Sequence, residues 1–378
     1  MDAVASAGNA QPAAALGWAR RAQEFYHVHE PACTAAFFVA GFLFDTLFVG
    51  RIDHLHNVLH QASYLALCAW LTGLEVREQN GAFTPPRRFE KAWRYHDAAT
   101  HFMLGTLLNI YTLFYFKSAS LTTSLLFLAF WAALLGVNEL RPFPGSATTL
   151  RMTLFSLCLV SYFGYLVPML AHHIGPPVFL GSLAAASLVV AALAWRLRRR
   201  LPQRPHVVWR ATWAPFAAVS ISFAALYFAK LIPPVPLSIH SMGVYHGAKR
   251  DGDGFLLYSA RSKWRFWERG DQTFLARPGD AIYCFVSVFS PTNFQEKLQL
   301  RFLYEDPKQG WEAQDAIPLG VTGGRDEGFR TVSVKTRYKP GRWLIRVETS
   351  DGRELGRLAF TVVLDPGTAP RQLRVIRA

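Results

Sequence analysis

The sequence predicts a polytopic α-helical membrane region of about seven spans, followed by an all-β antiparallel sandwich domain. Long apolar runs fill residues 32–232, whereas short β-rich runs with period-two alternation fill residues 237–364. The charges follow the same division. Residues 1–236 hold 18 Lys and Arg and 10 Asp and Glu, mostly between apolar runs, and the remaining charges are scattered as in a soluble domain.

Seven stretches have the length and apolar character of a membrane span, for which about 20 residues are needed. They are residues 32–50, 55–74, 98–116, 121–139, 152–171, 177–195 and 212–232. The first 30 residues do not resemble a signal peptide, because no short apolar region with a cleavage site occurs there. We therefore expect a cytoplasmic amino-terminal segment (1–31) and a seven-helix transmembrane domain (32–232).

A strongly basic segment, residues 195–210, lies between the last two expected spans. A nucleic-acid patch, an anionic-lipid patch and a topological anchor are all compatible with its six arginines: Arg196, Arg198, Arg199, Arg200, Arg204 and Arg210. The flanking apolar runs favour the anchor and argue against nucleic acid. Counted over alternate loops, one side of the membrane receives 15 Lys and Arg and the other receives two. This bias predicts an inner (plasma) membrane protein with a cytoplasmic amino terminus, anionic lipid headgroups at the cytoplasmic loops and a periplasmic carboxy-terminal domain.

After the last span, a Pro-rich linker (233–236) leads into the expected sandwich domain (237–364). Strands are predicted at residues 281–290, 298–304, 328–336, 342–349 and 355–364. Within the fourth, Trp343, Ile345 and Val347 should face one side of a sheet and Leu344, Arg346 and Glu348 the other. Residues 350–352 supply a hairpin turn. The polar tail (365–378) is expected to be loose.

Ionisable residues in the apolar half form the first candidate site. His56 and His60 are four residues apart, a spacing that places two metal ligands on one helix face. With Asp45, Asp53, His172 and His173 they lie near the expected periplasmic ends of helices 1, 2 and 5. The cluster is compatible with an intramembrane metal-dependent enzyme or a proton-coupled transporter, which is the alternative function. Structural pairing or a position at headgroup level explains the same residues without chemistry.

A second polar group opens the third expected span and lies toward the cytoplasmic side. It consists of His96, Asp97, His101 and Asn109. The seventh expected span contains no histidine, so a single metal site shared by all the spans is not expected. Four cysteines without a CxxC pair exclude a disulfide scaffold and a thiolate metal site. Nucleotide-binding, hydrolase and DNA-binding motifs are absent as well. The sequence leaves the cofactor unknown, and an enzyme is the less favoured class.

Aromatic and basic residues in the second half form a candidate ligand-binding site. Trp264, Arg265 and Trp267 are adjacent in SKWRFWERG, and Trp311 follows a glycine. Strand alternation across this segment would expose at least one tryptophan, which beside an arginine could stack on a sugar ring or contact lipid headgroups. Packing in the sandwich core is the alternative. Arg325 and Arg330 flank the Gly-rich segment GGRDEGFR, which could contact an anion or could be a solvated loop.

The carboxy-terminal pattern resembles a bacterial domain of unknown function, number twenty-nine fourteen. The resemblance covers residues 255–364 and is carried by PGDAIYCFVSV, IPLGVTGGRDEGFRTVSVKT and PGRWLIRVETSDGRELGRLAFTV. Its most specific part is the last hairpin, with Gly341, Trp343, Val347, Asp351, Gly352, Leu355, Gly356 and Phe360. YFKSAS and NEL in the first half are similar to the multi-span region that often accompanies that domain. The resemblance implies architecture and location but no activity. We therefore expect a membrane protein whose periplasmic sandwich binds an envelope partner, protein or glycan.

Overall fold

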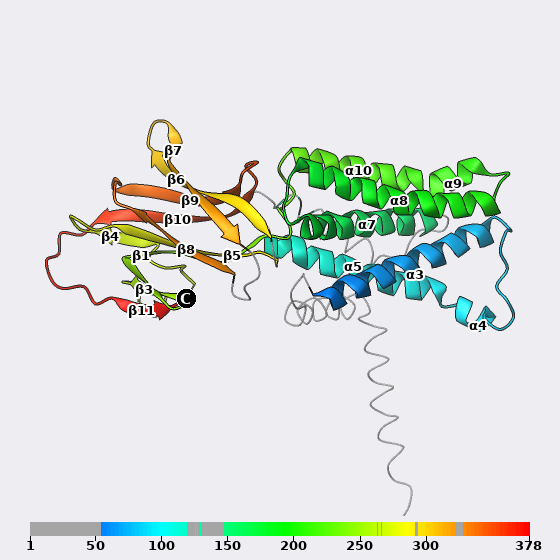
Figure 1. The fold of residues 1–378 in the computed structure, drawn as a ribbon, viewed down its shortest axis with the longest axis horizontal. Coiled ribbons are helices and arrows are strands. Elements are labelled where there is room, and N and C mark those ends of the chain that lie inside the picture. The colour runs from blue at the N-terminus through cyan, green and yellow to red at the C-terminus, as the bar shows by residue number, and fades with distance from the viewer. Residues whose placement is uncertain are drawn as a thin grey trace, which may run out of the picture. The chain divides into compact units, whose positions relative to one another are not determined.

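A computed structural model gives the fold and describes residues 54–118, 125, 127, 129, 147–262, 264, 265, 267–291, 294–322 and 328–378. The chain divides into two compact units, Met1–Gly50 and Arg51–Ala378. The described residues belong to the second unit, which contains both helices and strands (Figure 1).

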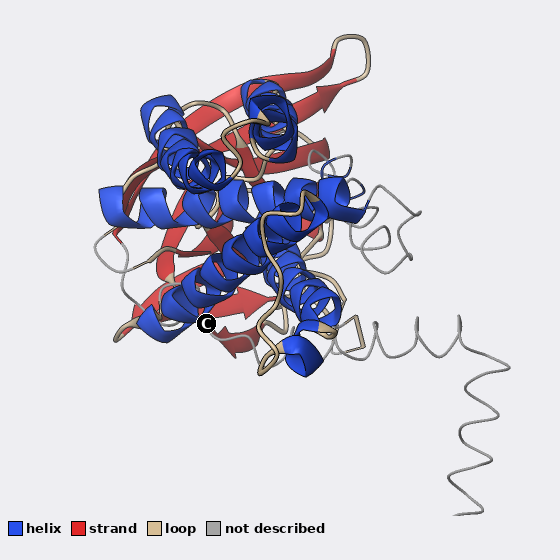
Figure 2. Cartoon of the chain, turned by 90° about the vertical axis from the view of Figure 1, so that its right-hand side faces the viewer, coloured by secondary structure: helices blue, strands red, loops and turns tan. Residues whose placement is uncertain are grey.

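The helices of this unit pack around α7. In chain order they are α3 (Leu55–Gln79), α4 (Glu90–Trp93), α5 (His96–Ser118), α7 (Ala147–Ala171), α8 (Pro176–Arg200), α9 (Pro205–Ala211) and α10 (Trp213–Phe228). α7 contacts α3, α5, α8 and α10, and large side chains such as Phe155 and Tyr165 on α7 are fully buried among them. Two of these helices, α8 and α9, begin with a proline. Proline is favourable there because the first turn of a helix needs no backbone N–H donor. These helices are the blue elements of Figure 2.

The prediction of about seven membrane spans is wrong. Among the residues that the structure describes, three helices are long and apolar enough to cross a membrane: Thr148–Ala171, Pro176–Arg200 and Pro205–Phe228. The stretches expected at 55–74 and 98–116 do form long, continuous helices, α3 and α5. Their apolar character is interrupted by polar residues such as His60, Gln61, His101 and Asn109. The other two expected spans, 32–50 and 121–139, lie outside the described residues except for Leu125, Phe127 and Ala129.

In the described part of the chain after the helices, eleven strands form three sheets. They are β1 (Ser238–Tyr245), β2 (Gly247–Asp251), β3 (Gly254–Ser259), β4 (Thr273–Ala276), β5 (Ile282–Phe289), β6 (Gln295–Asp306), β7 (Gly310–Thr322), β8 (Phe329–Lys335), β9 (Gly341–Thr349), β10 (Glu354–Leu364) and β11 (Arg374–Arg377). The sheet orders are β1-β5-β8, β4-β10-β9-β6-β7 and β11-β3-β2. The predicted β-rich region is thus confirmed, and each of the five predicted strands matches one of these.

A single apolar core joins the first two sheets into a sandwich. Cys284 and Val286 of β5 meet Trp343, Ile345 and Val347 of β9 in this core, and all five side chains are buried. Period-two alternation therefore places the β9 residues as the sequence predicts. Neighbouring Phe285 points to the opposite face of β5, where it packs with residues of the third sheet in a smaller cluster. The three-stranded sheet β1-β5-β8 is consequently covered on both faces.

Two features of the strands differ from the sequence prediction. β4 pairs with β10 in parallel, so the sandwich is not wholly antiparallel. The tail expected to be loose contains β11, which pairs with β3, and the backbone of Ala378 exchanges two hydrogen bonds with Phe255. Both pairings join segments about 90 or more residues apart, which local sequence pattern does not reveal.

Candidate functional site

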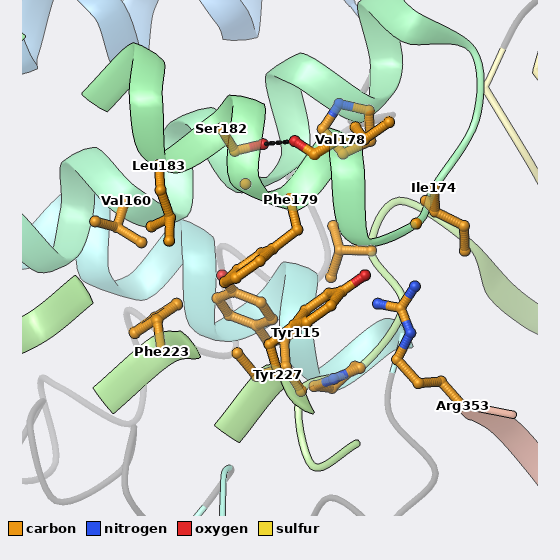
Figure 3. Close-up of a pocket in the computed structure, with 16 residues that line it drawn as sticks. Tyr115, Val160, Ile174, Val178, Phe179, Ser182, Leu183, Phe223, Tyr227 and Arg353 are labelled. Carbon is orange, nitrogen blue, oxygen red and sulfur yellow. Dashed lines mark hydrogen bonds between the residues drawn. The ribbon is translucent and has the colours of Figure 1, made fainter. Parts of the chain in front are cut away.

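A narrow pocket lies where the ends of α7, α8 and α10 meet the turn between β9 and β10 (Figure 3). Its walls are mainly apolar, with Val160 and Gly164 from α7, Phe179 from α8 and Phe223 from α10. Tyr227 stacks on Phe179, with ring centroids 3.9 Å apart and nearly parallel planes.

Among the described residues that line this pocket, Arg353 is the one with a charge, and only 5% of its side chain is exposed. It follows the β9–β10 turn. Its Nε atom donates to Oδ2 of Asp351 at 2.9 Å, and its guanidinium carbon lies 4.6 Å from the centre of the Tyr227 ring. Two buried polar groups of the pocket, Nη2 of Arg353 and the Tyr227 hydroxyl, have no hydrogen-bond partner among the described residues. The pocket therefore combines apolar walls with two unused donors at one end.

The turn that carries Arg353 is tightly built. The backbone N–H of Arg353 donates to Oγ1 of Thr349 at 3.0 Å, and Thr349 in turn donates to the Asp351 carboxylate. Gly352 has φ +81°, a conformation that favours glycine, and a Cβ atom there would lie 3.0 Å from Nζ of Lys230. A second cation thus lies beside the turn.

Glu296, at the start of β6, is the other carboxylate near this turn. Its Oε2 atom accepts a hydrogen bond from the backbone N–H of Ile174 at 3.2 Å. Burial raises the pKa of Glu296 above its usual value, and the nearby Asp351 adds to that shift, whereas the N–H of Ile174 and His173 oppose it. Both carboxylates of the region therefore already have donors within the chain.

Two tryptophans stand exposed in the loop between β3 and β4, at 85% for Trp264 and 67% for Trp267. Neither side chain packs in the sandwich core, so the alternative of core packing does not hold for these two tryptophans. The segment is a loop and not a strand, so strand alternation does not apply to it. Arg265 lies between them and forms an exposed ion pair with Glu268 at 3.4 Å. We call residues 260–270 the Trp loop.

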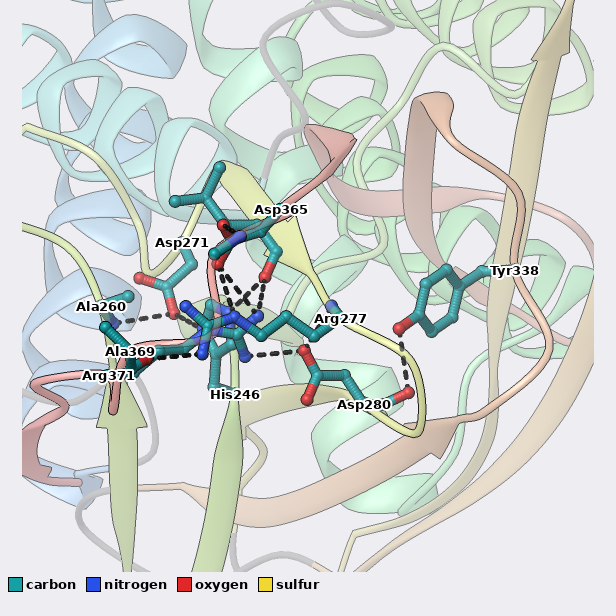
Figure 4. A network of polar contacts seen from close by, with 11 residues as sticks. His246, Ala260, Asp271, Arg277, Asp280, Tyr338, Asp365, Ala369 and Arg371 are labelled. Atoms are coloured by element: carbon teal, nitrogen blue, oxygen red, sulfur yellow. Dashed lines mark hydrogen bonds and ion pairs between the residues drawn. The ribbon is translucent and has the colours of Figure 1, made fainter.

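The start of the Trp loop is fixed by one buried carboxylate, Asp271. It accepts hydrogen bonds from the Ser259 hydroxyl (2.7 Å) and from the backbone N–H groups of Ala260 (3.2 Å) and Arg261 (2.9 Å). Its Oδ2 atom also lies 2.7 Å from Nδ1 of His246 (Figure 4). Four groups thus converge on Asp271 and fix the base of the Trp loop.

A second polar network in Figure 4 attaches the segment after β10 to the domain. Nε of Arg277 donates to Asp365 at 2.7 Å, and Arg371 donates to Oδ2 of Asp280 at 2.6 Å. The Tyr338 hydroxyl donates to the carbonyl of Asp280. These contacts explain why the polar tail has a defined course.

Two other predicted ligand residues, Trp311 and Arg330, lie on strands and not in the Trp loop. Trp311 is the second residue of β7 and is 40% exposed, and the guanidinium of Arg342 lies 5.8 Å from its ring centre. Arg330 lies on β8, and its Nη1 donates to the Asp253 carbonyl at 3.4 Å. Arg325 lies outside the described residues.

The histidines predicted as metal ligands occupy two places. His56 and His60 stack on one face of α3 with ring centroids 6.3 Å apart. His172 and His173 are exposed in the turn between α7 and α8, and Nδ1 of His173 lies 2.8 Å from the Ala171 carbonyl. Asp45 and Asp53 lie outside the described residues.

In the part of the chain that the structure describes, one group of three possible metal ligands occurs, and it contains none of those histidines. It comprises Glu75, His96 and Asp97. Arg151 lies between the two carboxylates, 2.5 Å from Glu75 and 2.8 Å from Asp97. A guanidinium already neutralises these carboxylates, so the group acts as an ion-pair network between α3, α5 and α7. His96 and Asp97 stood out in the sequence, but Glu75 and Arg151 did not.

One family model matches a part of the carboxy-terminal region. Residues 295–362 match the family described as "Protein of unknown function (DUF2914)". The match covers β6 to β10 and confirms the resemblance of the carboxy-terminal region to a domain of unknown function. It includes Arg353 and its turn. No curated protein matches the chain.

Solved structures give weak similarities. An immunoglobulin-like protein from Pseudomonas aeruginosa is 13% identical with a TM-score of 0.21, covering 34% of this chain and 98% of its own. A GH3 β-glucosidase from Bifidobacterium adolescentis is 10% identical with a TM-score of 0.19, covering 35% of this chain and 19% of its own. A β-glucosidase from Kluyveromyces marxianus is 12% identical with a TM-score of 0.18, covering 36% and 15%.

Proposed function

We propose that the helices anchor this protein in the inner membrane of a bacterium and present the β-rich domain to the periplasm, where the Trp loop binds an envelope partner, protein or glycan. The family match to a domain of unknown function and the three apolar helices support the coarser part, a membrane-associated protein with a β-domain. The exposure of Trp264 and Trp267 is the observation that carries the binding role.

The placement on the periplasmic side rests on charge. α8 ends in three consecutive arginines, and the last apolar helix begins directly after this basic segment. Basic loops beside membrane spans remain in the cytoplasm. The chain then runs through α10 to Phe228 and enters β1 at Ser238, so the β-domain follows from the opposite end of the span.

The binding role rests on the chemistry of the Trp loop. Trp side chains bury large areas and are enriched at binding surfaces, and their flat faces stack on sugar rings. Exposing two of them beside Arg265 is unfavourable unless a partner covers them. The fixed base of the loop at Asp271 reduces the conformational entropy that binding would have to overcome.

Photo-crosslinking in living cells tests this proposal. A benzoylphenylalanine replaces Trp264 in the full-length protein, and we expect a crosslinked product with an envelope protein or with the peptidoglycan. The matched control carries the same group at Val334, an exposed apolar residue of β8. A product of equal yield at both positions, or no product at Trp264, contradicts the proposal.

A second measurement separates the two kinds of partner. Full-length protein in detergent is sedimented with purified peptidoglycan sacculi, with the double variant Trp264→Ala and Trp267→Ala for comparison. A glycan partner predicts sedimentation that the double variant loses and that Trp311→Ala retains. A crosslinked protein without sedimentation assigns the loop to a protein partner.

A further inference from the structure

The pocket beside Arg353 has a polar end and an apolar end, and each is built from different elements. The polar end holds the Arg353 guanidinium and the Tyr227 hydroxyl. The apolar end is formed by α7, α8 and α10, through side chains such as Val160, Leu183 and Phe223. Figure 3 shows this division, with Arg353 entering from the side of the β-domain.

The polar end favours an anion. Counted over the whole residue, Arg353 is 4% exposed and Tyr227 is 6% exposed. Each has a buried donor without a partner among the described residues. Leaving such groups unpaired is unfavourable, particularly for a charged donor. Lys230 adds positive charge beside Gly352. The carboxylates of Asp351 and Glu296 accept hydrogen bonds from Arg353 and from the N–H of Ile174, and among the described residues no group accepts from the two free donors.

The position of the pocket favours an amphiphile over a soluble anion. Tyr227 is the next-to-last residue of α10, and Phe179 lies in the first turn of α8, so the polar end is level with the ends of two apolar helices. Aromatic residues at such ends mark the headgroup level of a bilayer. The apolar end, with Val160 and Phe223, lies one or more turns deeper.

We propose that this pocket binds a membrane phospholipid, with its phosphate against Arg353 and Tyr227 and the start of an acyl chain between α7, α8 and α10. Guanidinium groups bind phosphate oxygens strongly and with defined geometry. This proposal depends on the membrane placement proposed above, but it does not depend on which partner the Trp loop binds. It places a lipid between the helices and the β9–β10 turn that carries Arg353.

Binding of short-chain lipids to the full-length protein in detergent tests the proposal. The probes are dioctanoyl phosphatidylglycerol, dioctanoylglycerol, which lacks the phosphate, and inorganic phosphate. We expect the phosphatidylglycerol to bind, and Arg353→Gln to weaken its binding about tenfold or more, because a charged hydrogen bond is lost. The control is Arg199→Gln with Arg200→Gln in the basic segment, which should leave this affinity within about twofold.

A second variant tests the apolar end while Arg353 remains in place. Gly164→Leu adds a side chain to the pocket wall and should also reduce phosphatidylglycerol binding. Equal affinity for dioctanoylglycerol, or binding unchanged in both Arg353→Gln and Gly164→Leu, overturns the proposal. Tight binding of inorganic phosphate that Gly164→Leu leaves intact assigns the site to a free anion and also overturns it. Crosslinking at the Trp loop is unaffected by either result, so failure of this inference is distinguishable from failure of the proposed function.

Discussion

His246 and Asp271 form a buried pair, with Nδ1 of the imidazole 2.7 Å from Oδ2 of the carboxylate and both side chains at most 3% exposed. The imidazole also stacks on Phe274, with ring centroids 4.2 Å apart. Ser259 occupies the other carboxylate oxygen of Asp271 at 2.7 Å. The hydroxyl therefore contacts the carboxylate and not the imidazole. In a Ser-His-Asp triad the hydroxyl contacts the imidazole, so these three residues form a structural anchor and not a nucleophile.

Removing this anchor should loosen the Trp loop. Asp271→Ala leaves the Ser259 hydroxyl and the N–H groups of Ala260 and Arg261 without their acceptor, and we expect a loss of about 3 kcal/mol in the free energy of unfolding. Pulse proteolysis of the full-length protein in detergent measures this. Asp253→Ala, at an exposed turn, is the control and should change stability little. Equal stability of the two variants would show that Asp271 is not an anchor.

Lys335 is buried at one edge of the sandwich, and we predict that its hydrocarbon stem matters more than its charge. The ammonium lies 5.5 Å from the Phe302 ring centre and 5.0 Å from that of Trp343, and it pairs with Asp315. Lys335→Ala should lower the free energy of unfolding by about 2 kcal/mol, because it removes both the stem packing and the cation–π contacts. Lys335→Met keeps the stem and should lose about 1 kcal/mol or less. Denaturant titration compares them, and a larger loss in Lys335→Met would reverse this assignment.

Cys284 should be unreactive in the folded protein. It lies in the sandwich core with no exposed surface, and burial raises the pKa of its thiol to about 12. At pH 8 the thiolate, which is the reactive form, is therefore scarce and inaccessible. Iodoacetamide followed by mass spectrometry should modify Cys284 only after denaturation. Modification of the native protein at a rate comparable to that of a free thiol would show that β5 opens readily.

Acid should release the segment after β10. The pKa of Asp365 is lowered, first by the N–H of Gly367 and then by the hydrogen bond from Arg277. A carboxylate with a lowered folded pKa stabilises the fold above its unfolded value of about 4 and loses that effect as pH falls through the folded pKa. The protection factor of β11, which is the exchange rate of the unfolded chain divided by that of the folded protein, should therefore fall below about pH 4. Asp365→Asn should show the lower protection factor at pH 7 as well, whereas a β11 protection factor that is independent of pH and of this substitution would exclude the link.

The sequence predicted the strands whose pattern is local and regular. Trp343, Ile345 and Val347 alternate with Leu344 and Arg346, and one face is buried as expected. The parallel β4–β10 pair and β11 were missed because their partners are distant in sequence. The span count failed because α3 and α5 are helices of membrane-spanning length that carry too many polar residues.

The candidate sites were predicted to different degrees. Trp264 and Trp267 were identified by composition, although a loop, and not a strand edge, exposes them. Arg353 was missed, since an arginine after a hairpin turn is normally solvated and only the packing against Tyr227 shows that it is buried. The ion pair between Glu75 and Arg151 was also missed, because it depends on contacts between helices that the sequence does not show.

The central claim is that the β-domain and the basic segment lie on opposite sides of the membrane. Single cysteines at Gln203, in the basic segment, and at Lys308, in the β6–β7 turn, test it in a chain whose native cysteines are replaced by alanine. A membrane-impermeant maleimide should label Lys308→Cys in intact cells and Gln203→Cys only after the inner membrane is permeabilised. Labelling of Gln203→Cys in intact cells, with or without Lys308→Cys, would contradict the account.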